Sequence, residues 1–123
     1  MSRLDEAFDL ASKCWNKACT TEPEFVRAYL EHSEKLLTAH EEITGDMCKD
    51  YCVYSGVAKP KSLHHNSWVS GVRALWLIGW IDPIGQDIPR NRHNHMNTVT
   101  RWKSNLYKVG SGAIKYPYNL SLF

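Results

Sequence analysis

The sequence lacks a hydrophobic run long enough to cross a membrane. A helix that spans a bilayer needs about 20 mostly apolar residues, whereas the apolar stretch from Leu75 to Ile81 is far shorter. The N-terminus enters an acidic amphipathic pattern at once, which is not typical of a secretion signal. These two absences predict a cytoplasmic protein that has no membrane partner.

Carboxylates are scarce in the second half of the chain, where only Asp82 and Asp87 follow residue 60. Two-metal phosphoryl transfer generally uses several carboxylates, and no glycine-rich loop of a nucleotide-binding type is present. The segment His93-Asn94-His95 suggests an HNH nuclease, but that motif spreads its residues over a strand, a loop and a helix. No cysteine has surroundings that would activate it as a nucleophile. We therefore expect no enzymatic activity and no cofactor.

Cysteine is limited to four residues, and all of them lie in segments with helical spacing. In a cytosolic protein these thiols should be reduced. Cys48 and Cys52 would share one face of a helix, and with His64 and His65 they would supply the ligand types of a zinc site. Two adjacent histidines cannot easily reach one ion together. We expect small buried thiols and no metal, although the sequence leaves open whether Cys48 and Cys52 bind one.

Charge is distributed unevenly along the chain. Residues 1–59 hold seven Lys or Arg against eleven Asp or Glu, a net charge of −4, whereas residues 60–123 hold eight against two, a net charge of +6. Affinity for phosphates rests on basic side chains that displace counterions. The basic second half therefore favours a polyanion-binding surface, with chance segregation of solvated charge as the alternative.

Apolar residues recur every three or four positions in the first half of the chain. This spacing predicts helices over about 2–19, 22–40 and 45–54, with a short first strand near Ile43. Thr21 and Glu24 match a capping box for the second helix, and Gly56 ends the third. Residues 1–20 are expected to form an amphipathic helix that packs either on the domain or on a dimer partner.

A fourth helix is predicted from Ser67 to Ile78, with Asn66 as its N-cap. Its apolar face is expected to be buried and consists of Trp68, Val69, Val72, Leu75 and Trp76. The other face is small and polar, is expected to be exposed, and is suited to close approach to DNA; it consists of Ser67, Ser70, Gly71, Arg73 and Ala74. Gly71 in mid-helix costs about 1 kcal/mol relative to Ala, which indicates close approach to a partner or to another helix.

A β-hairpin is predicted after Gly79, with strands near Trp80–Ile84 and Val99–Trp102. The loop between them, residues 85–97, is rich in basic and amide side chains, and residues 109–123 form an irregular tail. The expected fold is mainly α with a small β-hairpin: a winged helix-turn-helix over residues 21–108, preceded by an N-terminal helix.

The landmarks of this region form a recognisable series: Trp68-x-x-Gly71, then Gly79-Trp80-Ile81, then Arg90…His95…Val99-x-x-Trp102-x-Ser104. The series resembles small winged-helix proteins encoded by bacteriophages, over about residues 22–107. This chain has Trp68-Val-Ser-Gly where those proteins commonly have Trp-Gly directly. The resemblance implies DNA binding or regulation of phage or host processes in the host cytoplasm.

These features predict a duplex-DNA-binding protein that acts in regulation or replication. The residues expected to face the major groove are His65, Asn66, Ser67, Ser70 and Arg73. Those expected to contact the DNA backbone or the minor groove are Arg90, Arg92, His93 and His95, flanked by Arg101 and Lys103. The alternative is a winged-helix interaction module that binds a host protein and inhibits or redirects it.

Overall fold

The computed structural model describes residues 2–64, 67–87 and 99–110. In these residues the chain forms five helices and a three-stranded antiparallel sheet, so the predicted mainly α fold with a small β component is confirmed. In chain order the elements are α1 (Arg3–Ala11), α2 (Asn16–Thr21), α3 (Pro23–Ala39), β1 (Glu42–Thr44), α4 (Gly45–Tyr54), α5 (Ser67–Leu77), β2 (Ile81–Asp87) and β3 (Val99–Ser104).

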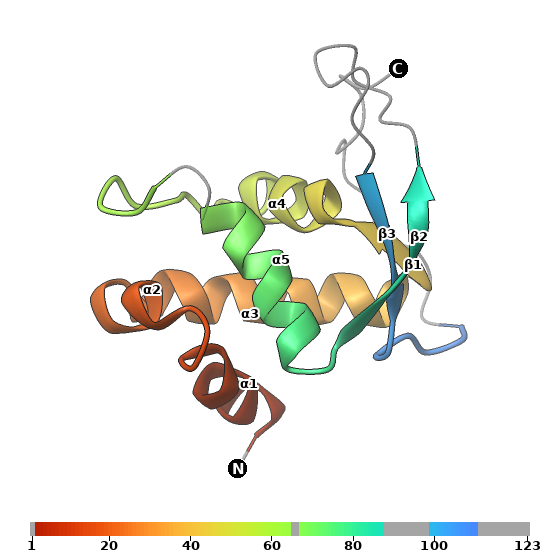
Figure 1. The fold of residues 1–123 in the computed structure, drawn as a ribbon, viewed down its shortest axis with the longest axis horizontal. Helices are drawn as coiled ribbons and strands as arrows, with labels where there is room; N and C mark the ends of the chain where they lie inside the picture. Colours follow the sequence, from red (N-terminus) through yellow and green to blue (C-terminus); the bar gives the residue numbers. More distant parts are fainter. Residues whose placement is uncertain (1, 65–66, 88–98, 111–123) are drawn as a thin grey trace.

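Helix α3 is the centre of the packing. Figure 1 shows it lying across the molecule, with α1 and α2 toward one end and the sheet at the other, and α4 and α5 both pack against it. Its apolar stripe is fully buried and includes Val26, Tyr29, Leu30, Leu36 and Leu37. No helix within the described ranges is both long and apolar enough to cross a bilayer.

The N-terminal region forms two helices, and the prediction of one helix over residues 2–19 was wrong. The backbone N–H groups of Ser12 and Lys13 donate to the carbonyls of Phe8 and Leu10 and close α1, and the chain bends before Trp15, the N-cap of α2. This bend buries the Trp15 indole edge-on against Phe25. Burial of a large aromatic side chain therefore outweighs the continuous helical pattern of the sequence.

The predicted capping box at Thr21 is also absent. Thr21 is the last residue of α2, so its hydroxyl donates to the carbonyl of Lys17 at 2.8 Å instead of capping α3. Glu22 is the N-cap of α3 and makes no side-chain capping bond, while Pro23 occupies the first turn. Only Glu22 separates the two helices, so the same residue is the C-cap of α2 and the N-cap of α3.

The sheet has the order β1-β3-β2, with all neighbours antiparallel. The predicted short strand and hairpin strands are confirmed, except that β2 continues to Asp87, into residues predicted as loop. Ile43 lies opposite Trp102, and Ile81 lies opposite Ser104. Ile43, Ile81 and Ser104 are buried, so this face of the sheet lies against the helices. The Ser104 hydroxyl donates to the Leu37 carbonyl at 2.6 Å and ties β3 to α3.

Candidate functional site

Helix α5 buries its predicted small face, whereas of its predicted apolar face only Leu75 is fully buried and Trp68 and Val72 are half-buried against the core. Gly71 and Ala74 are buried and Ser67 is only 7% exposed, whereas Val69 is 69% exposed and Trp76 is 45% exposed. The predicted small outer face is therefore wrong for Ser67, Gly71 and Ala74, and Ser70 is half-buried; only Arg73 of that set is fully exposed.

The burial of the small face has a steric cause at Gly71. A Cβ added there would lie 2.7 Å from Cζ of Tyr29, a side chain that is itself fully buried in the core. The small side chains therefore let α5 approach the Tyr29 ring on α3. Trp68, at the start of α5, packs edge-on against Phe25 with a centroid distance of 5.3 Å.

The substitution Gly71→Ala is expected to destabilise the fold by about 1–2 kcal/mol. Overpacking against the Tyr29 ring costs about 1–3 kcal/mol, which exceeds the gain of up to about 1 kcal/mol from the better helix propensity of alanine. Urea denaturation followed by circular dichroism measures the change. Ser70→Ala is the matched control in the same helix and should shift stability by less than about 0.5 kcal/mol. A stabilised Gly71→Ala variant would contradict this account of the α3–α5 contact.

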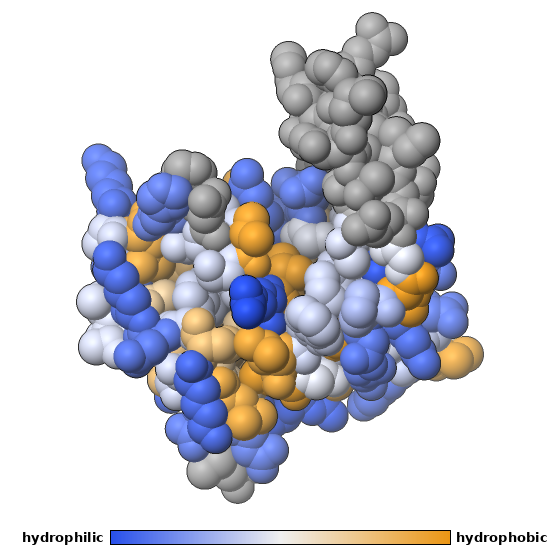
Figure 2. All heavy atoms as spheres, in the orientation of Figure 1, coloured by the Kyte–Doolittle hydropathy of each residue, from blue (hydrophilic) through white to orange (hydrophobic). Residues whose placement is uncertain are grey.

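The exposed face of α5 lines an open groove with a volume of about 560 Å³. Figure 2 shows hydrophobic and near-neutral residues over the middle of the molecule in this view, interrupted by a strongly hydrophilic group at the centre, with further hydrophilic residues toward the edge. The lining comes from α4 and the residue before it, from α5 and from β3; it consists of Thr44, Gly45, Asp46, Lys49, Trp68, Val69, Val72, Arg73, Trp76, Thr100 and Trp102.

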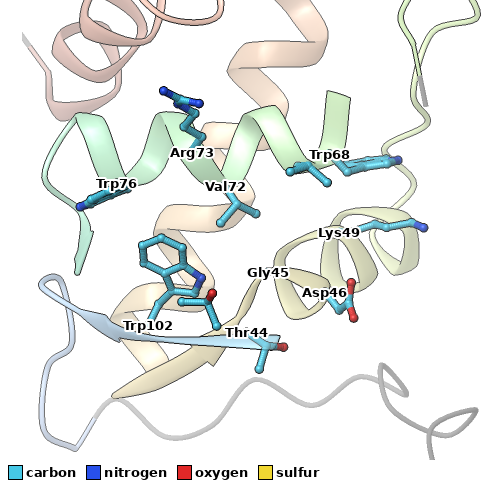
Figure 3. Close-up of a pocket in the computed structure, with 11 residues that line it drawn as sticks. Thr44, Gly45, Asp46, Lys49, Trp68, Val72, Arg73, Trp76 and Trp102 are labelled. Carbon is cyan, nitrogen blue, oxygen red and sulfur yellow. The ribbon is translucent and has the colours of Figure 1, made fainter. Parts of the chain in front are cut away.

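Close contacts fix the shape of this groove. Figure 3 shows Val72 pointing from α5 toward Gly45 at the start of α4, where an added Cβ would lie 3.1 Å from Cγ2 of Val72. Trp76 and Trp102 form one end, with ring centroids 5.7 Å apart, and Trp68 stands toward the other. A partly exposed indole pair and an aliphatic wall suit the insertion of apolar side chains.

The charged residues of the groove are Asp46, Lys49 and Arg73. Neither Lys49 nor Arg73 forms an ion pair within 4 Å among the described residues. Burial raises the pKa of the neighbouring Asp50, repulsion from Asp46 raises it further, and Lys49 opposes the rise. Arg73 leaves α5 on the side away from Val72 (Figure 3), so it lies at the rim of the groove, while Lys49 lines the groove from α4.

The basic residues of β3 lie on another surface. Side chains alternate between the two faces of a strand, so Arg101 and Lys103 point away from the groove that Thr100 and Trp102 line. Arg101 pairs with Glu42 at 3.5 Å, and Lys103 is opposite Glu42 and Asp82 in the sheet register. The structure therefore does not bring Arg73 together with Arg101 and Lys103. Six predicted site residues lie outside the described ranges: His65, Asn66, Arg90, Arg92, His93 and His95.

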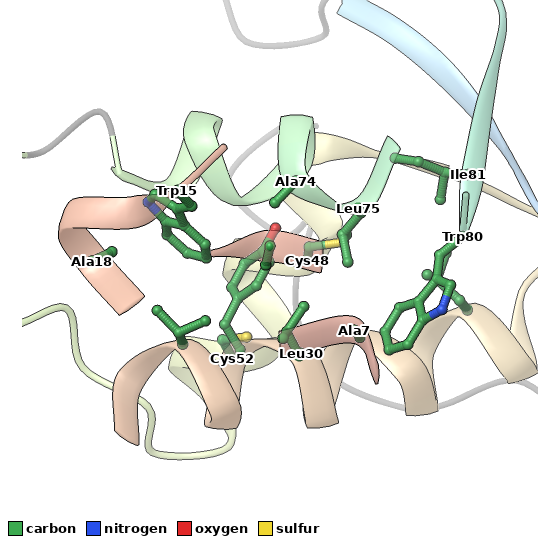
Figure 4. Packing of buried hydrophobic residues seen from close by; sticks show 14 of the residues in the cluster. Ala7, Trp15, Ala18, Leu30, Cys48, Cys52, Ala74, Leu75, Trp80 and Ile81 are labelled. Atoms are coloured by element: carbon green, nitrogen blue, oxygen red, sulfur yellow. The ribbon is translucent and has the colours of Figure 1, made fainter. Parts of the chain in front are cut away.

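The thiols of α4 belong to the core, as predicted. Cys48 and Cys52 are fully buried, and Figure 4 shows both among the packed side chains. Burial raises the pKa of each thiol to about 12, which keeps both neutral and unreactive at pH 7. Within the described part of the chain, no group of three or more His, Cys, Asp or Glu residues is arranged to hold a metal ion.

The sequence prediction missed the groove residues Val69, Val72, Trp76 and Trp102 as a site. One signal was present: Ser67, Gly71 and Ala74 follow each other at spacings of four and three, so small residues share one face of the helix. Such a face suits close helix packing, which leaves the larger apolar face to solvent or to a partner.

Comparison with protein-family models, with curated proteins and with solved structures found no match to this chain. The resemblance to phage winged-helix proteins therefore stays a prediction.

Proposed function

We propose that the protein is a non-enzymatic winged-helix module that binds another protein through the α5 groove. The order helix, strand, helix, helix, hairpin, together with the strand order β1-β3-β2, supports the winged-helix assignment. In that assignment α5 corresponds to the recognition helix, whose outer face would carry polar groups if it read DNA bases. The exposed positions of α5 are Val69, Arg73, Trp76 and Leu77, so three of the four are apolar.

The single observation that carries the proposal is the exposed apolar face of α5. Contiguous exposed apolar surface rimmed by polar residues is typical of protein-interaction sites. Trp76 is 45% exposed and lies beside Trp102 of β3, with the two ring planes inclined at 55°. Tryptophan side chains held in this way often supply much of the binding energy of an interface.

Affinity capture with the substitution Val69→Asp tests the proposal. The wild-type chain should recover one stoichiometric protein from a lysate of its native cell, and the Val69→Asp chain should recover it at least about tenfold less well. A charge placed in the apolar groove must be desolvated on binding, while the exposed position leaves folding unchanged. Binding is then measured with the purified partner by calorimetry.

Lys103→Ala is the matched control, because Lys103 lies on the outer face of the sheet, away from the groove. It should bind the partner as the wild type does. Equal binding by the Val69→Asp and wild-type chains, with both folded by circular dichroism, would reject the groove as the interface.

Duplex-DNA binding is the second candidate, and a separate observation favours it. The net charge of +6 over residues 60–123 and the exposed side chains of Arg101 and Lys103 suit contact with phosphates. Titration of a random duplex at about 50 and 200 mM salt should then show a steep loss of affinity with salt. Arg101→Ala should weaken all sequences alike and flatten the salt dependence. No DNA binding at the lower salt concentration would remove this candidate and leave the groove proposal in place.

A further inference from the structure

We propose that the groove takes an acidic amphipathic segment of a partner protein, a more specific claim that rests on the proposed function. The segment would place large apolar side chains between Trp68 and the Trp76–Trp102 pair. It would direct carboxylates at Lys49 and Arg73. The partner segment therefore carries large apolar side chains flanked by Asp or Glu.

The size and apolar lining of the groove favour a partner segment with large apolar side chains. Its volume of about 560 Å³ falls within the roughly 300–1,000 Å³ of pockets that hold compact ligands. Val69, Val72 and the indoles of Trp76 and Trp102 offer carbon atoms over most of this space. An amphipathic segment that inserts a few side chains and keeps its own backbone outside fits such a groove.

The charged residues of the groove favour an acidic partner segment. The groove is lined by two cations and one anion, Lys49, Arg73 and Asp46. Asp46 lies in the first turn of α4, where the helix N-terminus already interacts favourably with its carboxylate. Arg73 has no carboxylate within 4 Å among the described residues, so it is available to a partner's carboxylate. A basic segment would instead place like charges beside Lys49 and Arg73, which disfavours its docking.

A peptide selection tests the partner chemistry without knowledge of the natural partner. A displayed library of random peptides of about 16 residues, long enough for roughly four helical turns, is selected on the full chain and counter-selected on Val69→Asp. The enriched peptides should combine several large apolar residues with a net negative charge. Enriched peptides that depend on Val69 but are neutral or basic would overturn the acidic claim and leave the proposed function standing. If no enriched peptide depends on Val69, both the acidic-partner proposal and the proposed protein-binding function are wrong.

A charge exchange then tests the two cations. A synthetic peptide of an enriched sequence should bind the Lys49→Glu/Arg73→Glu chain about tenfold more weakly than the wild type. The same peptide with its acids replaced by lysine should gain a similar factor on that chain. Equal affinities across all four combinations would overturn the electrostatic pairing.

The indole N–H signals of the ¹⁵N-labelled chain report where the peptide binds. Those of Trp76 and Trp102 should shift on titration, while those of the buried Trp15 and Trp80 should not. An oligothymidine strand is the comparison probe, because bases can stack on exposed indoles beside cations. If that strand shifts the same signals at lower concentration than the peptide, the groove is a nucleic-acid site and the proposal is wrong.

Discussion

Replacing Trp15 by alanine is expected to lower the free energy of unfolding by about 3–5 kcal/mol, the usual cost of truncating a large buried aromatic side chain. The residue is only 6% exposed. Its indole meets Phe25 and Tyr29 edge-on, with ring centroids 6.0 and 5.5 Å away. The substitution would leave a cavity between α2 and α3 that the surrounding rings cannot easily close. Urea denaturation at pH 7, followed by far-ultraviolet circular dichroism, measures the change.

Trp76→Ala is the matched control, because it removes the same side chain from the groove instead of the core. Trp76 is 45% exposed, so its loss should cost less than about 1 kcal/mol. The pair therefore separates the indole that holds the fold together from the indole available to a partner. Equal destabilisation by the two substitutions would mean that the groove is part of the core. An unchanged Trp15→Ala variant would mean that α1 and α2 do not depend on this contact.

Local signals in the sequence were sufficient for much of the fold. Apolar spacing and helix-ending residues predicted α3 and α4, and the predicted range of α4, residues 45–54, agrees with the structure. An isolated Ile43 between polar residues marked β1, and alternation marked β3. Each of these features depends on residues that are close together in the chain, so sequence pattern alone can report it.

The orientation of α5 depends on a residue that is distant in the sequence. Both of its faces are free of long charged side chains except at Arg73, so hydrophobic pattern alone favoured burying the larger residues. The ring of Tyr29 instead favours burial of the small face, because only a residue without a Cβ fits against the ring at Gly71. The break between α1 and α2 has the same origin, since Trp15 turns to reach Phe25 on α3.

The groove could not be predicted because its walls come from three separate parts of the chain. Residues 44–49, 68–76 and 100–102 meet only through the pairing of β1 with β3 and the packing of α5. The antiparallel register places Trp102 opposite Ile43 and so beside the start of α4. A shift of one residue in that register would turn the Trp102 side chain to the outer face of the sheet.

Raising the pH from 8 to 10 is expected to lower the free energy of unfolding by about 4 kcal/mol through Cys48 and Cys52 alone. Burial is the first cause that raises the pKa of both thiols to about 12, whereas a thiol in the unfolded chain titrates near 8.5. Between these values the unfolded chain loses protons that the folded protein keeps, so base favours unfolding. The stabilising contribution is complete below the unfolded pKa and is lost as the pH rises toward the folded value. Urea midpoints at pH 8, 9 and 10 measure the slope.

Single substitutions assign this pH dependence to particular thiols. Cys52→Ala removes one of the two buried groups, so it should remove about half of the loss attributed to them between pH 8 and 10. Cys14→Ala should change the slope less than Cys52→Ala does, because Cys14 is exposed and Cys52 is buried, although burial also raises the pKa of the Cys14 thiol. Burial also raises the pKa of Tyr29 well above its usual value, so the phenol steepens the same trend only at higher pH. A slope that Cys52→Ala does not alter would show that the α4 thiols are reached by solvent in the folded protein, in conflict with their place behind α3 and α5.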